Sequence, residues 1–381
     1  MKKVKLIEPE KFAVLPWGWT ECNKKTLKDI KKCGFNLAGF MRPDDLKLVQ
    51  KAGLKGIVFD PSIQVTGDLI GIDIAAIKRR INNLMKKIKK QEAIFGYYLC
   101  DEPSSVLFPA LKKWVAMFKK IAPDSIAYIN LFPDYATNTQ LGTNGYKEYL
   151  ENYVKTVEPA FISYDNYSLM DDGSLRASYF TNIEAIRAIA LRYQKSFWNI
   201  VLSNAHFHYA EPTEAGLRFQ LYTTLAYGAR GISYFTYFTP QTGNYRLAPI
   251  DQFGNKTPTW YMLRNVNMQL HNLAPVYVTL KNINVFHHPD VPDGCGGIQT
   301  ARLIKEVRGD NLLVGEFEAA DKCPYAIVVN KSLNRSTCFS VQFKEAGKIN
   351  MINPYSGSLV PWGGENNWLA PGQGMLLCVQ K

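Results

Sequence analysis

Short apolar segments alternate with amphipathic segments along roughly the first 250 residues. Each apolar segment is rich in β-branched or aromatic residues and is bounded by Gly, Pro, Asn or Asp, a pattern typical of a buried strand. We therefore expect eight strands, at residues 12–19, 35–41, 54–60, 93–100, 125–132, 160–167, 197–202 and 231–238.

The segments between these strands have the spacing of helices. The clearest has Ile74, Ile77, Ile81, Leu84 and Ile88 at intervals of three or four, which places them on one face of a helix. Similar stripes begin at 111, 183 and 217, and the last follows Pro212-Thr213, where Thr213 is a suitable N-cap.

Eight strands alternating with helices predict a (β/α)₈ TIM barrel over residues 1–281. A doubly wound open sheet is the alternative, but it usually has about six strands and a glycine-rich phosphate loop after the first. The first strand here ends in Leu15-Pro16-Trp17-Gly18-Trp19, without such a loop. The barrel is therefore favoured.

The pattern changes after a last helix near 259–273. Short strands at 312–317, 325–330, 337–343, 349–353 and 375–379 are separated by turn residues such as Gly309-Asp310-Asn311. This spacing predicts a small antiparallel β-sandwich domain over residues 282–381.

Composition excludes several classes of protein. The 381 residues are 46% hydrophobic, which is enough for a large core, and the seven cysteines form no C-x-x-C pair. The net charge of +12 raises nucleic acid as a partner, but the lysine clusters fall on the polar sides of amphipathic helices, so we expect no nucleic-acid partner. There is no apolar run of about 20 residues that would span a membrane.

The N-terminal residues give a mixed signal about export. Met1-Lys2-Lys3 resembles the start of a signal peptide, but Glu8, Glu10 and Lys11 interrupt the apolar stretch that should follow. A periplasmic or extracellular location is expected if a signal peptide has been removed.

Catalytic groups of a TIM barrel come from the C-terminal ends of the strands. These ends are rich in aromatic, amide and carboxylate side chains and poor in cations, which favours a neutral polyol such as a sugar, although some of the rings would simply fill the barrel. The substrate-binding candidates are Trp17, Trp19, Arg42, Asp60, Tyr98, Asn130, Tyr164, Tyr167, Asn204, His206, His208, Tyr234 and Tyr237.

Glu102 is the main catalytic candidate. It follows the fourth strand, Pro103 fixes the chain directly after it, and the neighbouring aromatic residues would leave its carboxyl poorly solvated. Desolvation raises a carboxyl pKa, as general acid catalysis at neutral pH requires, and Asp101 would act in the same direction if both point inward. The alternative is an ordinary acidic residue at the start of a helix.

The segment GYYLCDEPS (96–104) resembles the strand-four acid/base segment of clan A barrel glycoside hydrolases. The segment GARGISYFTYFTP (228–240) is similar to the eighth strand of loosely family-39-like gut-bacterial members, which also append a C-terminal sandwich. The resemblance implies Glu102 as general acid/base and a nucleophilic Glu at the end of strand seven.

Strand seven departs from that pattern, because residues 201–208 contain no carboxylate. Glu211 could fold back over the mouth, or Asp165 could be the partner, a placement that resembles barrel α-galactosidases. Asp101 and Glu102 could instead act with an acetamido group of the substrate. We rank Asp165 first, because alternation places it on one strand face with Ser163 and Tyr167, although it could equally accept a hydrogen bond from a substrate hydroxyl.

His206 and His208 would share a strand face and suggest a metal-dependent hydrolase, but only five histidines exist, and no metal or other cofactor is expected. The sequence thus favours a glycosidase acting on an oligo- or polysaccharide. A carbohydrate-binding barrel without activity and a metal-dependent barrel hydrolase are the alternatives.

Overall fold

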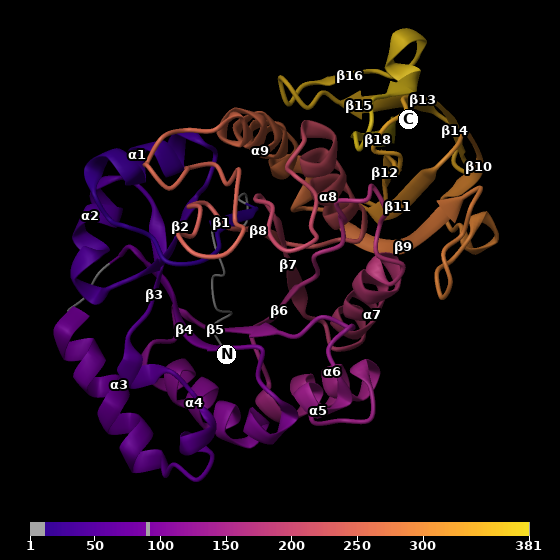
Figure 1. Cartoon of the computed structure of the whole chain (residues 1–381). Helices are drawn as coiled ribbons and strands as arrows, with labels where there is room; N and C mark the ends of the chain where they lie inside the picture. The colour runs from indigo at the N-terminus through magenta and orange to yellow at the C-terminus, as the bar shows by residue number, and fades with distance from the viewer. Residues whose placement is uncertain (1–11, 89–91, 381) are drawn as a thin grey trace.

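Eight parallel strands form the N-terminal barrel of the computed structural model, which describes residues 12–88 and 92–380 (Figure 1). The leader-like residues 1–11 and the lysines at 89–90 lie outside the described residues. The strands are β1 (Ala13–Pro16), β2 (Leu37–Met41), β3 (Lys55–Val58), β4 (Ile94–Asp101), β5 (Ile126–Leu131), β6 (Phe161–Asp165), β7 (Ser196–Leu202) and β8 (Gly231–Phe235).

Consecutive strands pair from β2 through β8, and β8 pairs with β1. The ring closes just beyond β1, where the Phe40 N–H donates to the Gly18 carbonyl (2.9 Å) and the Thr20 N–H donates to the Phe40 carbonyl (2.9 Å). The expected TIM barrel and its eight strands are confirmed.

Helices surround the barrel (Figure 1), and their buried apolar residues belong to one core cluster with residues of the barrel strands. In α3, Ile77, Ile81, Leu84 and Ile88 are buried as expected, and Thr213 caps α8 by accepting from the Gly216 N–H (3.0 Å). The helices are α1 (Lys24–Lys32), α2 (Leu46–Lys51), α3 (Ile74–Ile88), α4 (Phe108–Ile121), α5 (Asn138–Leu141), α6 (Tyr146–Val157), α7 (Tyr179–Arg192), α8 (Glu214–Ala226) and α9 (Pro258–Tyr277).

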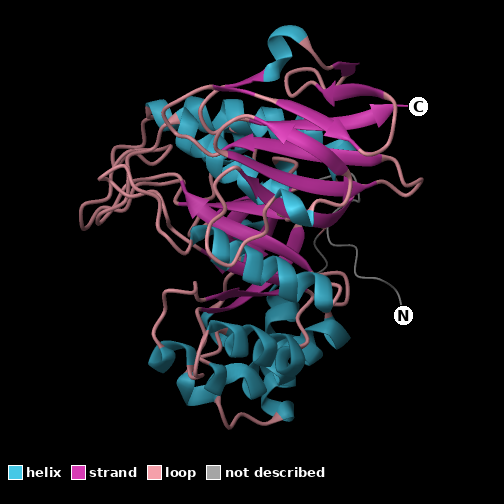
Figure 2. Ribbon diagram, turned by 90° about the vertical axis from the view of Figure 1, so that its right-hand side faces the viewer, coloured by secondary structure: helices cyan, strands magenta, loops and turns pink. Residues whose placement is uncertain are grey.

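The inside of the barrel is packed with rings. Tyr98, Tyr128 and Trp198 belong to one buried cluster with residues of β1, β2, β3 and β6. Gly231 makes room for this packing, since a Cβ there would lie 2.6 Å from the Trp198 ring. The barrel is therefore a filled core below its mouth, and long loops project from one side of it (Figure 2).

The C-terminal part is built of antiparallel strands, as expected. A six-stranded sheet has the order β16-β15-β18-β12-β11-β9, and two short pairs, β10-β14 and β13-β17, accompany it. The strands are β9 (Lys281–His288), β10 (Ile304–Arg308), β11 (Leu312–Glu318), β12 (Pro324–Asn330), β13 (Thr337–Cys338), β14 (Ser340–Phe343), β15 (Lys348–Ile352), β16 (Leu359–Pro361), β17 (Trp368–Leu369) and β18 (Gly374–Gln380).

Several features of this part were not predicted. The strand expected at 337–343 is divided into β13 and β14, which pair with different partners. β9, β10, β16 and β17 were missed. The sequences of β9 and β10, KNINVFHH and IKEVR, are too polar to stand out as buried strands, and β16 and β17 have only three and two residues.

The six-stranded sheet is buried on both faces. In β12, Ala326 and Val328 face the short strand pairs, whereas Ile327 and Val329 join the large core that continues into the barrel helices. Because successive side chains of a strand point to opposite faces, one strand contributes to both layers. The C-terminal domain thus shares its core with the barrel.

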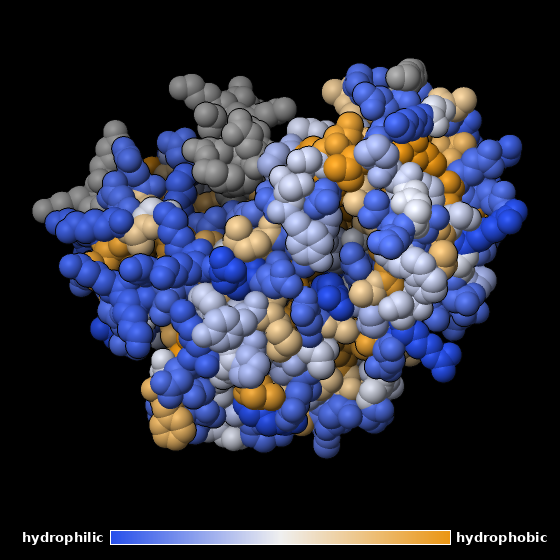
Figure 3. Space-filling model, turned by 90° about the horizontal axis from the view of Figure 1, so that it is seen from above, coloured by the Kyte–Doolittle hydropathy of each residue, from blue (hydrophilic) through white to orange (hydrophobic). Residues whose placement is uncertain are grey.

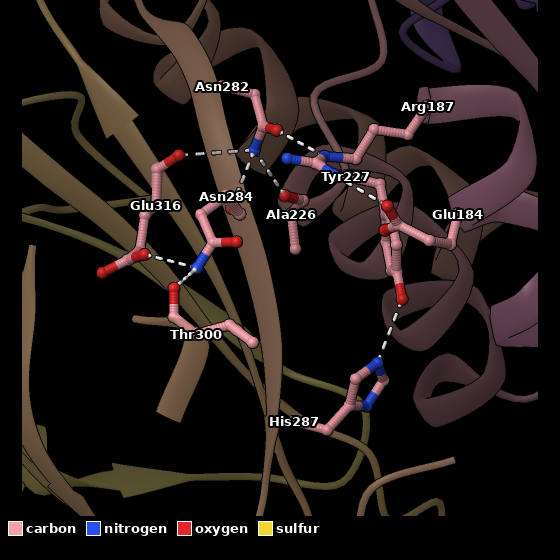
Figure 4. Close-up of polar contacts among 9 residues, drawn as sticks. All are labelled: Glu184, Arg187, Ala226, Tyr227, Asn282, Asn284, His287, Thr300 and Glu316. Carbon is pink, nitrogen blue, oxygen red and sulfur yellow. Dashed lines mark hydrogen bonds and ion pairs between the residues drawn. The ribbon is translucent and has the colours of Figure 1, made fainter. Parts of the chain in front are cut away.

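Polar side chains fasten this junction (Figure 4). Asn282 on β9 accepts from Arg187 Nε of α7 (2.6 Å) and donates to the Ala226 carbonyl at the end of α8 (3.1 Å). Tyr227, directly after α8, pairs its hydroxyl with His287 Nε2 (3.0 Å). One strand of the C-terminal sheet is thereby tied to two barrel helices.

The face of the molecule seen in Figure 3 is largely hydrophilic, with apolar side chains among the polar ones. The lysines of α1, α3 and α4 lie largely on exposed helix faces, as expected from their spacing. Within the described ranges, no helix combines the length and the apolar character needed to cross a membrane.

Gly315 on β11 lies where the C-terminal sheet packs closely against helix α8 of the barrel. A Cβ at this position would lie 2.1 Å from the Ala226 carbonyl oxygen, so Gly315→Ala should lower the free energy of unfolding by about 1–3 kcal/mol through overpacking. Gly71→Ala is the matched control, because a Cβ there meets open space. Urea unfolding followed by circular dichroism measures both; equal effects would contradict the close fit.

Candidate active site

A β-bulge near the end of β4 sets the direction of Asp101. The pairing with β5 shifts between Tyr98 and Cys100, so that Asp101 lies beside Asn130. Tyr98 faces the barrel interior, whereas Leu99 and Cys100 both pack in the outer core. If the same residues alternated strictly, without a bulge, Asp101 would stand three positions after Tyr98 and would point outward. The bulge therefore brings this carboxylate into the barrel mouth.

Asn130 connects two carboxylates from different strands. Its Nδ2 donates to Asp101 Oδ1 (3.1 Å) and to Asp165 Oδ1 (2.7 Å). Its Oδ1 accepts from the Ser163 hydroxyl (3.0 Å), whose oxygen pairs with the Tyr128 hydroxyl (2.8 Å). Because Ser163 gives its only proton to Asn130, Tyr128 is the donor in that last pair. The hydrogen bonds from Tyr128 to Ser163 and from Ser163 to Asn130 thus orient the Asn130 amide, whose N–H groups point toward the two carboxylates.

Glu102 follows Asp101 in an unusual backbone conformation. Its φ is 44°, in the left-handed region that non-glycine residues seldom occupy, and its N–H donates to the Asn130 carbonyl (2.8 Å). Such a conformation costs about 1–3 kcal/mol and persists where surrounding structure enforces it, often at functional sites. The backbone thus holds Glu102 at the mouth.

The electrostatics of the site favour protonated carboxyl groups. Burial, with a smaller contribution from Asp101, raises the pKa of Glu102 to about 7. The pKa of Asp165 lies well above its usual range because of burial and the charge of Glu102, and the hydrogen bond from Asn130 opposes this. Asp101 has an exposed surface at the mouth, yet desolvation by the protein around its carboxyl raises its pKa. Hydrogen bonds from Asn130 and Tyr98 act in the opposite direction and lower this pKa. The structure therefore brings Asp101, Glu102 and Asp165 together.

Aromatic rings lie beside these carboxylates. Tyr98 stacks on Phe40 (4.2 Å between centroids), and Tyr167 stacks on Phe235 (5.5 Å). The charge of Asp165, after burial, raises the pKa of Tyr167 and that of Tyr135, which places both hydroxyls near this carboxylate. Tyr135 was missed from the sequence, although an aromatic residue in the loop directly after strand five was a usable signal.

Other residues expected to bind substrate stand at the edge of the mouth, in the loops after β1 to β3. Trp17 is buried against Phe40 and Tyr98, while Trp19 is 47% exposed. The Arg42 guanidinium lies over the Trp19 ring, 5.3 Å from its centroid. Asp60 caps a short helical turn through the Ser62 N–H (2.9 Å) and pairs with Lys87 (3.5 Å).

Two tyrosines assigned to substrate binding lie elsewhere, and their assignment needs correction. Tyr164 and Tyr234 alternate with the inward residues of β6 and β8, so they pack in the layer between strands and helices. Neither ring offers a stacking face to a ligand. Tyr237 is also largely buried, and its hydroxyl accepts from Trp260 Nε1 (3.0 Å), but it lines a cavity between the loops after β1 and β8.

The segment after β7 also differs from expectation. The strand ends at Leu202, so His206 and His208 do not share a strand face. His206 is buried, donates through Nδ1–H to Asn204 Oδ1 (2.9 Å) and stacks on Tyr245, whereas the His208 side chain is 88% exposed. Glu211 is tied to Arg246 (2.7 Å) on the outer part of the loop. The structure does not group Glu211 with the central carboxylates.

Burial, together with the nearby Arg246, lowers the pKa of His206 to about 4, so this imidazole is neutral at pH 7. Among the residues that the structure describes, no group of three or more His, Cys, Asp or Glu side chains is arranged to hold a metal ion. Cys100 is buried, as expected, and burial with the Asp101 charge raises its pKa to about 12.

Comparison with known proteins relates the chain to glycosidases by fold. No family model matches the sequence, and no curated protein matches it. A GH42 β-galactosidase from G. stearothermophilus has a TM-score of 0.64 at 7% identity, covering 98% of each chain. A family 5 glycoside hydrolase from Bacteroides vulgatus has a TM-score of 0.59 at 11% sequence identity, and the match covers 97% of this chain and 90% of that one. A further glycoside hydrolase has a TM-score of 0.59 at 13% sequence identity, and the match covers 97% of this chain and 93% of that one.

These similarities show that the chain has the TIM-barrel fold of glycoside hydrolases with an added β-domain. At such low identity they show the fold alone. The chemistry must be argued from the side chains at the mouth.

Asp165→Asn tests how much the ionised, buried carboxylate of Asp165 destabilises the folded protein. Because the pKa of Asp165 is raised by folding, the native state loses stability relative to the unfolded chain as the pH rises above 3.8, the ordinary value. The variant removes this loss and should be more stable than the wild type at pH 7.5, with a smaller gain at pH 4.5. Thermal unfolding at both pH values measures the difference.

Asp172→Asn is the matched control with the opposite sign. Hydrogen bonds to Ser174 lower the pKa of Asp172, so its contribution is present above 3.8, and the variant should gain no stability at pH 7.5. An Asp165→Asn variant that is destabilised equally at both pH values would show that Asp165 is not a strained buried acid.

Proposed function

We propose that this protein is a glycosidase in which Glu102 donates a proton to the leaving glycosidic oxygen. The observation that carries the proposal is the group of three carboxyls, Asp101, Glu102 and Asp165, gathered by Asn130 at a ring-lined barrel mouth. A carboxyl with a pKa near 7 is suited to general acid catalysis at neutral pH.

Asp165 is the second carboxylate of the proposed mechanism. The two hydrogens of the Asn130 amide go to Asp101 and Asp165, which leaves none for Glu102. Burial favours the neutral form of Asp165, but the hydrogen bond from Asn130 opposes this, and Asn130 donates no such bond to Glu102. The proposed mechanism therefore places the proton shared by the two carboxyls on Glu102. Glu102 then protonates the oxygen as the C–O bond breaks, and Asp165 attacks the sugar carbon or activates a water.

The substrate is proposed to be an oligo- or polysaccharide. Neutral amide, hydroxyl and aromatic groups such as Asn130, Tyr98 and Tyr167 suit sugar hydroxyls and the apolar faces of sugar rings. We also propose that the barrel domain spans residues 1–281 and the sandwich domain spans residues 282–381. Residues 228–240 are further proposed to correspond to the eighth strand of loosely family-39-like glycoside hydrolases. Since one structural neighbour is a β-galactosidase, 4-nitrophenyl β-D-galactopyranoside is the first probe in a panel of aryl glycosides.

Glu102→Gln should lower kcat/KM by about 10²- to 10⁴-fold, because the amide keeps the shape of the side chain but cannot donate an acidic proton. Glu306→Gln, on an exposed strand of the C-terminal domain, is the control and should retain activity. Steady-state kinetics on the cleaved glycoside measure both. If Glu211→Gln abolishes activity while Asp165→Asn does not, the assignment of the second carboxylate is wrong.

The pH profile tests the state of Glu102. Since the acid acts in its protonated form, kcat/KM should fall as the pH rises through about 7. Asp101→Asn removes a charge that helps to raise this pKa, so the alkaline limb should move to lower pH. Asp310→Asn, at an exposed turn, is the control and should leave the limb in place. An alkaline limb that stays fixed in Asp101→Asn would contradict the proposed coupling.

A carbohydrate-binding barrel without hydrolysis is the second candidate. It is favoured by one observation, the lack of a carboxylate in residues 201–208, where the resemblance to clan A enzymes requires a nucleophile. If wild type and Glu102→Gln both bind sugars and neither cleaves the panel, this second function replaces the first.

A further inference from the structure

Two cavities at the barrel mouth share one wall. The first, of about 560 Å³, lies between the loops after β1 and β8 and is lined by Trp17, Trp19 and Phe238 among others. The second, of about 460 Å³, lies between the loops after β2 and β3 and is lined by Trp19, Arg42 and Phe59. Trp19 is common to both, and both have the size of small-molecule sites.

The Trp19 ring is held in place although it is half exposed. Arg42 lies over the ring at 5.3 Å, and Phe59 meets it edge-on at 6.4 Å with an interplanar angle of 85°. A backbone bridge between Trp19 and Phe40 fixes the start of the loop. An exposed ring that is already ordered loses little conformational entropy when a ligand stacks on it.

Both cavities adjoin the rings beneath the carboxylates. Trp17, in the wall of the first, lies 5.9 Å from Tyr98 between ring centroids, and Phe59, in the wall of the second, lies 6.2 Å from the same ring. Tyr98 hydrogen-bonds to Asp101. A chain bound at the carboxylates can therefore continue toward Trp19.

The charges around the cavities do not favour an anion. The first is lined by Glu21, Asp29 and Asp251 against Lys25, and the second by Asp44 and Asp60 against Arg42 and Lys87. Two of these acids are paired, Asp29 with Lys256 (2.9 Å) and Asp60 with Lys87 (3.5 Å). A lining without an excess of basic side chains suits a neutral sugar better than a phosphate or an anionic chain.

We propose that Trp19 is a platform between two outer sugar-binding subsites, so that the substrate is a linear glycan whose units away from the cleaved bond occupy these cavities. The catalytic part of this statement rests on the proposed glycosidase function, but the binding part does not. Binding energy from remote units is then available to position the bond at Glu102.

The test measures binding in the full-length Glu102→Gln background, in which cleavage is suppressed. Isothermal titration calorimetry with cellotetraose, xylotetraose, mannotetraose and β-1,4-galactotetraose, each beside its monosaccharide, identifies the chain that binds. Adding Trp19→Ala should weaken tetrasaccharide binding by about tenfold, which corresponds to ~1.4 kcal/mol, and this loss should be at least fivefold larger than that for the monosaccharide. Trp19→Phe should restore most of the affinity.

Trp368→Ala is the matched control, because Trp368 is similarly exposed (57%) but lies on β17 in the C-terminal domain. It should not change the affinity for any of the probes. Equal losses for monosaccharide and tetrasaccharide in Trp19→Ala, or no binding of any tetrasaccharide, would overturn the platform. A tetrasaccharide that binds through Trp19 in a protein that cleaves nothing would support the platform and refute the glycosidase.

Discussion

The amide of Asn130, held between two acidic side chains, is the interaction on which the mouth of the barrel depends. It brings Asp101 and Asp165 within reach of one donor, and Ser163 and Tyr128 fix its orientation. Three carboxyls in one place repel one another once ionised. In the proposed mechanism, the hydrogen bonds from Asn130 stabilise charge on two of them, and the proton is left to Glu102. This asymmetry would distinguish an acid catalyst from a cluster of like charges.

The outline of the fold could be predicted from the sequence because both hydrophobic periods are clear in it. All eight barrel strands and the stripe of α3 follow directly from spacing. β9 and β10 could not be found in this way, since their stability comes from neighbours in the sheet rather than from an apolar sequence.

The candidate site was partly predictable. Position at or directly after the end of a strand singles out Asp165 and Glu102 as candidates. It does not show on which side of a strand a ring lies, so Tyr164 and Tyr234 were assigned to the pocket although they pack outside the barrel. Alternation fails at Asp101 for a further reason, since a bulge is a property of the pairing between strands and leaves no mark in the sequence of one of them. The loop after β7 likewise buries His206 and exposes His208, a difference that their spacing of two residues does not indicate.

The bulge in β4 also constrains how this gene can change. Deleting the codon for either Leu99 or Cys100 would restore regular pleating and leave Asp101 beside Asn130, because Asp101 would then stand two positions after Tyr98, on the same face of the strand. Deleting both codons would instead turn Asp101 out toward the helices and separate it from Asn130. The barrel would retain its eight strands in both cases, so the number of residues in this short stretch decides whether a folded barrel keeps its acidic centre.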